Sequence, residues 1–100
     1  MIKSRGNTAV AMTFENGYTI SIIYGYGSYS SNKNHKKEID LSKEYEVTSS
    51  TVEIAIWDED GYWYNFGTDT VNGYVSIDDL AEWIYKTKNF PNLKTENKNE

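Results

Sequence analysis

The sequence contains no cysteine, one proline, one arginine and one histidine among its 100 residues. The absence of cysteine excludes disulfides, thiolate metal sites and cysteine nucleophiles, and it fits a reducing compartment. Because Arg5 is the only arginine, a bidentate contact to phosphate or guanine has a single candidate. No apolar run is long enough to span a membrane or to form a signal peptide after Met1, so we expect a cytoplasmic protein without membrane contact.

Aromatic side chains and acidic charge are what the chain has in quantity. Aromatic residues make up 15%, with nine Tyr and three Trp, which is too rich for a disordered chain. The length predicts one small domain over residues 1–90, with a mobile polar tail over 91–100. A net charge of -5 argues against direct nucleic-acid binding through a basic surface.

Residues 8–24 predict a first β-hairpin. The segments 8–14 and 18–24 alternate between large apolar and small or polar side chains, as strands do. A two-residue turn at Asn16-Gly17 would put the two apolar sets on opposite faces, whereas a three-residue loop over 15–17 aligns them. We therefore expect that loop, with Gly17 in the left-handed conformation. The resulting partners are Phe14 with Tyr18, Met12 with Ile20, and Val10 with Ile22.

Residues 51–66 predict a second hairpin by the same reasoning. The strands are 51–57 and 62–66, joined by a three-residue loop over 59–61. The expected partners are Ile56 with Tyr64 and Ile54 with Phe66 on one face, and Trp57 with Trp63 on the other.

A helix is predicted between Ser76, as its N-cap, and Asn89, shortly before Pro91. Asp78 and Asp79 fall in its first turn, where the helix dipole favours acids. Its apolar stripe is expected at Ile77, Leu80, Ala81, Ile84 and Lys88. The predicted fold is α+β, a four-stranded, mainly antiparallel sheet of two hairpins with this C-terminal helix packed on one face.

A long polar insert over residues 25–50 separates the two hairpins. A structureless loop of that length is unusual in a small domain. Either residues 38–47 form a short element, or the insert is a binding segment.

No motif indicates an enzyme, a cofactor or a metal. Asp58-Glu59-Asp60-Gly61 resembles the opening of a calcium loop, but the residues after it form a strand pattern and supply no ligands. His35 lies among lysines without a positioned partner. No serine lies in a nucleophile elbow, and Gly25-x-Gly27 lacks the third glycine of a phosphate loop. The chain is therefore expected to act without catalysis.

The face of the sheet opposite the helix is the most informative feature. It combines small side chains with two tryptophans, a composition typical of binding surfaces. In one interpretation this face binds a partner. In the other, the insert folds over the tryptophans and makes a second small core with Tyr26 and Tyr29. The candidate partner-binding residues are Trp57, Trp63, Ile23, Tyr26 and Tyr29.

Three segments resemble small bacteriophage and prophage proteins of unassigned function. They are the strand-turn-strand run over 14–22, the strand over 52–57, and Val71-Asn72-Gly73-Tyr74-Val75 before the acidic helix. The resemblance is a pattern of strands and turns over residues 8–86, and it carries no functional residue. It implies a phage or mobile-element origin, and with it a role in binding a host protein, such as inhibition of a defence complex.

Three functional hypotheses follow. The first is a non-enzymatic binding protein that occludes a host protein through the tryptophan face. The second is a small-ligand binder in which aromatic side chains stack on a nucleotide-like ring. The third is an acidic mimic of DNA, ranked last because its carboxylates are scattered over different elements. A homodimer through the tryptophan face is compatible with all three.

Overall fold

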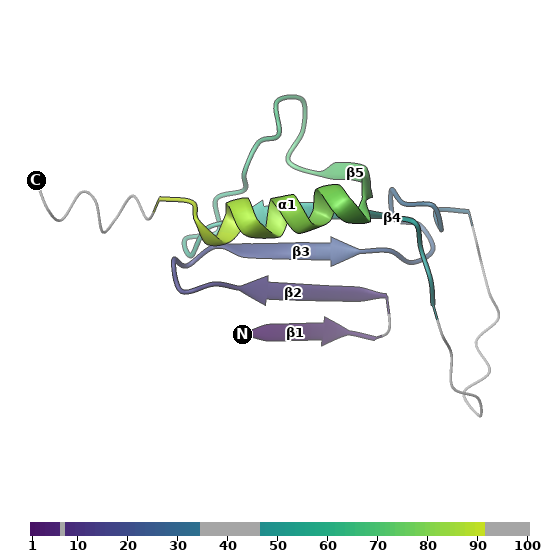
Figure 1. Ribbon diagram of the computed structural model, residues 1–100, viewed down its shortest axis with the longest axis horizontal. Coiled ribbons are helices and arrows are strands. Elements are labelled where there is room, and N and C mark those ends of the chain that lie inside the picture. Colours follow the sequence, from purple (N-terminus) through teal and green to yellow (C-terminus); the bar gives the residue numbers. More distant parts are fainter. Residues whose placement is uncertain (7, 35–46, 92–100) are drawn as a thin grey trace, which may run out of the picture.

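The computed structural model describes residues 1–6, 8–34 and 47–91. It contains an antiparallel sheet and one C-terminal helix, as the sequence predicts (Figure 1). The strands run in sequence order across a single sheet. The elements are β1 (Ile2–Arg5), β2 (Ala9–Thr13), β3 (Thr19–Ile23), β4 (Thr51–Trp57), β5 (Asn72–Ser76) and α1 (Ile77–Lys88).

The sheet has five strands, so the predicted count of four is wrong. The additional strand at one edge, β1, pairs with β2 so that Lys3 lies opposite Ala11 and Arg5 opposite Ala9. Its sequence is mixed and polar and all four of its residues are exposed, so it lacks the apolar alternation that identifies a strand.

The first hairpin has the predicted register. Met12 lies opposite Ile20 and Val10 opposite Ile22. The Phe14 amide donates to the Tyr18 carbonyl at 2.9 Å, which closes the three-residue loop. Gly17 has a φ of 88°, in the left-handed region that glycine adopts without steric cost.

The second hairpin is confirmed only at its tip. Trp57 lies opposite Trp63, and the Tyr64 amide donates to the Ile56 carbonyl at 2.7 Å. Residues 62–66 are not a strand, and the predicted pairing of Ile54 with Phe66 is wrong, because β5 takes that edge of β4 and places Asn72 opposite Ile54. The rings of Tyr64 and Phe66 in this segment pack instead on the helix, with Phe66 5.0 Å from Trp83 between ring centroids.

A β-bulge interrupts the pairing of β4 with β5. The register shifts between Val52 and Ile54, so two residues of β5 oppose one of β4. Tyr74, in this bulge, has a φ of 53°, an uncommon conformation for a bulky residue. The Tyr74 amide donates to the carbonyl of Tyr29 at 2.7 Å, so the insert holds the bulge in place.

Helix α1 begins and ends where predicted. The Ser76 hydroxyl accepts from the Asp79 amide at 3.1 Å, and Asn89 is the C-cap. The predicted stripe is corrected: Ile77, Ala81 and Lys88 are exposed. The packed residues are instead Leu80, Trp83, Ile84 and Thr87, spaced i, i+3, i+4 and i+7.

We call the side of the sheet against α1 the covered face. The helix runs along the strand direction over β3 and β4 (Figure 1) and also contacts β5. Ile20, Ile54 and Ile56 are fully buried beneath it. The side chain of Asn16 ties the β2–β3 loop to the end of α1, because its amide donates to the carbonyls of Thr87 at 2.8 Å and Phe90 at 3.1 Å.

The two ends of the insert are joined by a polar clasp of Ser31, Asn32, Thr48 and Ser49. The Ser31 and Ser49 hydroxyls lie 2.7 Å apart, and the Asn32 amide donates to the carbonyls of Tyr24 and Thr48. His35, most of the segment 38–47 and the tail from 92 onward lie outside the described residues. In the described ranges, no helix is long and apolar enough to cross a membrane.

Candidate functional site: the open face of the sheet

The other side of the sheet, which we call the open face, carries short side chains on its inner strands. Strand alternation and register order these side chains in rows across the sheet. One row runs Lys3, Ala11, Ser21, Ala55, and the next runs Arg5, Ala9, Ile23, Glu53. A third row contains Thr13, Thr19 and Trp57, with the two threonine hydroxyls 2.8 Å apart.

A cavity of about 240 Å³ lies on the open face. We call it the trough. Its floor is formed by β2 and β3, and long side chains stand on either side of it, on β1 and at the end of β4. The residues that line it include Lys3, Arg5, Ala9, Ala11, Thr13, Thr19, Ser21, Ile23 and Trp57.

Stacked tryptophans form the wall of the trough on the β4 side. The rings of Trp57 and Trp63 are 5.3 Å apart between centroids, with 30° between their planes. Trp63 remains 51% exposed, whereas Trp57 is half-buried between Trp63 and the trough. Such a pair holds a flat apolar surface in a fixed orientation.

Two cations form the wall on the β1 side. Lys3 and Arg5 share this face because they are two residues apart on a strand. Both are exposed, and neither forms an ion pair with any residue in the described part of the chain. The trough therefore has one basic wall and one aromatic wall.

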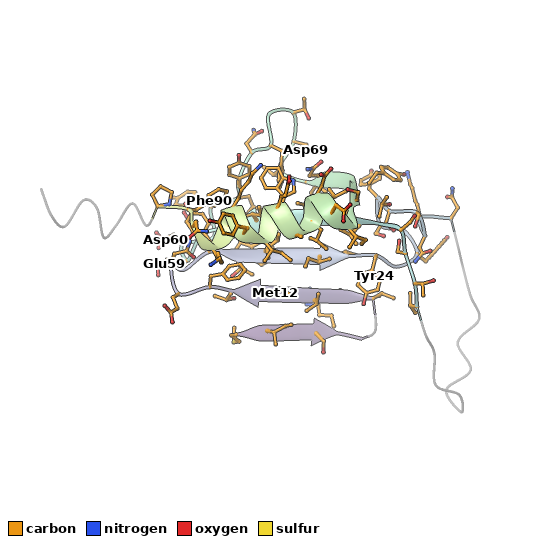
Figure 2. The ribbon with its side chains drawn as sticks, viewed as in Figure 1. Met12, Tyr24, Glu59, Asp60, Asp69 and Phe90 are labelled. Carbon is orange, nitrogen blue, oxygen red and sulfur yellow. The ribbon has the colours of Figure 1, made fainter. Side chains whose placement is uncertain are left out.

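Most acidic side chains of the described residues lie away from the trough. Glu59 and Asp60 lie in the loop after β4, at the same end of the molecule as Phe90 (Figure 2). Asp78 and Asp79 lie at the opposite end, in the first turn of α1. Burial, and secondarily the negative charge of Asp58, raises the pKa of Tyr18 in the loop region beside them. Among the described residues, no group of acidic or histidine side chains could hold a metal ion.

The described part of the insert lies over β4 and β5, away from the tryptophans. The Tyr29 amide donates to a Glu53 carboxylate oxygen at 3.4 Å, and the Tyr29 ring packs against Tyr74. Tyr26 is 63% exposed. Within the ranges the structure describes, neither tyrosine makes a ring contact with Trp57 or Trp63, so this part of the insert forms no second core over them.

Of the five candidate residues, the structure brings three together on the open face and separates two. Trp57 and Ile23 line the trough, and Trp63 backs Trp57. Tyr26 and Tyr29 do not line it. Sequence reasoning missed Lys3 and Arg5, because it did not identify β1, whose exposed and mainly polar residues lack the apolar alternation of a strand.

Comparisons with protein-family models, with curated proteins and with solved structures give no match to this chain. The proposed function therefore rests on the open face itself.

Proposed function

We propose that the protein is a non-enzymatic binding protein that uses the trough to dock a segment of a protein partner. The observation that supports this proposal is the trough on the open face. Among the described residues, helix α1 packs on the other side of the sheet and the insert reaches the open face at Glu53, outside the trough, which keeps an aromatic wall, a basic wall and a low floor. Aromatic residues and arginine are the side chains that contribute most to protein interfaces.

The shape of the trough favours a protein segment. Its volume of about 240 Å³ lies below the ~300–1,000 Å³ of typical small-molecule pockets. The residues that line the trough come from β1, β2, β3 and the end of β4, so a protein segment placed there would contact four strands. The resemblance to phage proteins would make the partner a host protein.

The test is partner capture with a matched pair of substitutions. Ser21→Phe fills the floor of the trough, whereas Ser4→Phe puts the same ring on the other side of β1. The tagged full chain is incubated with host lysate, and captured proteins are identified by mass spectrometry. A partner retained by the unmodified chain and by Ser4→Phe, but lost by Ser21→Phe and by the double variant Trp57→Ala/Trp63→Ala, supports the proposal. Capture that survives in both trough variants, with circular dichroism unchanged, contradicts it.

A nucleotide-like ligand is the second candidate, favoured by one specific observation. The trough places a flat aromatic wall, two hydroxyls and two cations around one cavity. These are groups that could stack on a base and neutralise a phosphate. A nucleotide at a hundred times its dissociation constant would stabilise the fold by about 2.7 kcal/mol. A thermal-shift panel of nucleotides in which no melting temperature changes would count against this candidate.

A further inference from the structure

A protein segment bound in the trough has to form its backbone hydrogen bonds within itself. Strands β2 and β3 lie inside the sheet, each paired on both sides, so their amides and carbonyls are already bonded. The floor that they offer consists mainly of alanine, serine and threonine side chains. An extended segment laid there would bury amides and carbonyls without partners, whereas a helix bonds its own. The chemistry of the floor therefore favours a helix.

The spacing of the walls suits a helix that rests on the open face, with only the side chains of its inner arc entering the trough. From β1 to β4 there are three strand spacings, about 14 Å, and a helix with its side chains measures about 10–12 Å across. The strands of the floor have five residues each, which corresponds to about 17 Å. A helix that matches the trough therefore has about eleven residues.

The charges of the walls specify the flanks of that helix. Lys3 and Arg5 lack ion-pair partners among the described residues, so the flank facing β1 should carry carboxylates. The flank facing Trp57 should be apolar. The docked helix would thus be amphipathic along its length, with an acidic arc beside an apolar arc.

Helix α1 of this same chain has those properties on its outer side. It has 12 residues, or about 18 Å of length. Ile77 and Tyr85, spaced i and i+8 with Ala81 between them, form a mainly apolar arc that is 51% and 65% exposed at its two ends. Lys88 lies in the same arc, with its ammonium 5.4 Å from the centroid of the Tyr85 ring. Asp78 and Glu82 lie in the adjoining arc, about 100° further round the helix, and both are exposed. This outer side is not used by the core, which takes Leu80, Trp83, Ile84 and Thr87.

We propose that the trough of one copy docks the outer side of α1 from a second copy. Ile77, Ala81 and Tyr85 then face the Trp57 wall, and Asp78 and Glu82 face Lys3 and Arg5. The inference rests on the proposed function, since it uses the same trough as a docking site for a protein segment. Because α1 and the trough lie on opposite faces of the sheet, each copy can both receive and supply a helix. The contact is heterologous, and copies stack in an open chain.

Pairing between two β1 edges is the competing mode of self-association. The mutual hydrogen bonds of Met1 with Thr13 mean that the amides and carbonyls of Ile2 and Ser4 point to the open edge. A two-fold pairing through these groups would bring Lys3 next to its own copy, and like charges directly opposite one another are unfavourable. The edge is thus a weaker site for a second copy than the trough.

The test is complementation between two variants of the full chain, followed by sedimentation velocity. Ser21→Phe blocks the trough and leaves the outer side of α1 unchanged. Tyr85→Glu puts a charge on the outer side of α1 and leaves the trough unchanged. We expect the unmodified chain and the control Ser4→Phe to form a concentration-dependent series of oligomers. Each of the two variants alone should remain monomeric, and an equimolar mixture should give a dimer, since only one productive contact remains. Charge reversal at both Lys3 and Arg5 should weaken association about tenfold.

Each other outcome overturns the inference. A chain that stays monomeric at all concentrations has no such contact, and the proposed function can still hold with a different partner. Association that persists in Ser21→Phe but is lost in Ser4→Pro identifies the β1 edge. A mixture that stays monomeric although each variant keeps the circular dichroism of the unmodified chain contradicts docking of α1 in the trough.

Discussion

The two faces of the sheet are built from alternate residues of the same strands, yet their side chains differ in size and in burial. Along β3, Ile20 and Ile22 are buried under α1, whereas Ser21 between them lies on the floor of the trough. Along β4, Ile54 and Ile56 are fully buried and Trp57 stands beside the trough. The covered face contributes the apolar burial that stabilises the fold, so the open face is free to vary in shape and charge.

The largest difference between the faces should be seen in stability. Ile54→Ala removes a fully buried side chain and should reduce the free energy of unfolding by about 2–5 kcal/mol. Ser21→Ala, on the open face of the neighbouring strand, should change it by less than about 1 kcal/mol. Urea denaturation of both variants measures the contrast. Equal losses would mean that the open face contributes to the core as much as the covered face does.

Attachment of the helix should depend on one loop side chain. Asn16→Ala removes both hydrogen bonds to the carbonyls at the end of α1 and should cost about 1–2 kcal/mol. Asn16→Asp is the sharper control, because it keeps the oxygen that accepts from the Tyr18 amide but loses the donors. If the aspartate variant is as stable as the unmodified chain, Asn16 does not hold α1 on the covered face.

The aromatic wall should contribute little to the free energy of unfolding and much to the near-ultraviolet circular dichroism spectrum. Trp63→Ala removes a stacked pair worth about 0.5–1.5 kcal/mol. We expect a small shift of the thermal midpoint together with loss of the near-ultraviolet circular dichroism from the coupled rings. Trp83→Ala, on the covered face, should be far more destabilising. A similar loss of stability at both positions would argue that the wall is part of the core.

The smallest expected effect on folding stability is the one linked to the titration of Tyr18 at alkaline pH. Burial, followed by the charge of Asp58, raises the pKa of Tyr18 above 10.0, so the folded state holds this phenolic proton more tightly than the unfolded state does. The associated stability is fully present below pH 10.0 and is lost as the pH rises through the folded pKa. Asp58→Asn should lower that pKa, as followed by tyrosinate absorbance. A Tyr18 titration unmoved by this change would exclude Asp58 as a cause.

The first hairpin could be predicted to the residue because its register has only one solution. A one-residue slip would have moved Met12 and Val10 to the opposite face from Ile20 and Ile22. The cap at Ser76 was equally readable, since the hydroxyl, the acidic first turn and the later proline all mark the same helix.

The second hairpin and the basic wall could not be predicted for related physical reasons. Local alternation at Tyr62, Tyr64 and Phe66 fits a strand, but the rings of Tyr64 and Phe66 gain more by packing on Trp83 and Phe90. The edge of β4 then goes to a segment with a bulge and two turn-type residues, Asn72 and Gly73. At the other edge, β1 is held by ladder hydrogen bonds that any sequence can make, so its side chains gave no signal.

The polar clasp at the base of the insert has a consequence for how the chain can change. The Asn32 side-chain amide donates to the Thr48 carbonyl, the Ser50 amide donates to the Ser31 hydroxyl, and the Ser31 and Ser49 hydroxyls are hydrogen-bonded to each other. These bonds bring the two arms of the insert together. The spacing between β3 and β4 is set by their own ladder, and the clasp closes the connection next to it, so neither depends on how many residues lie between the two arms of the clasp. Since closing a longer loop adds little entropy cost, this position can accept a foreign peptide or a whole domain while the sheet keeps its register.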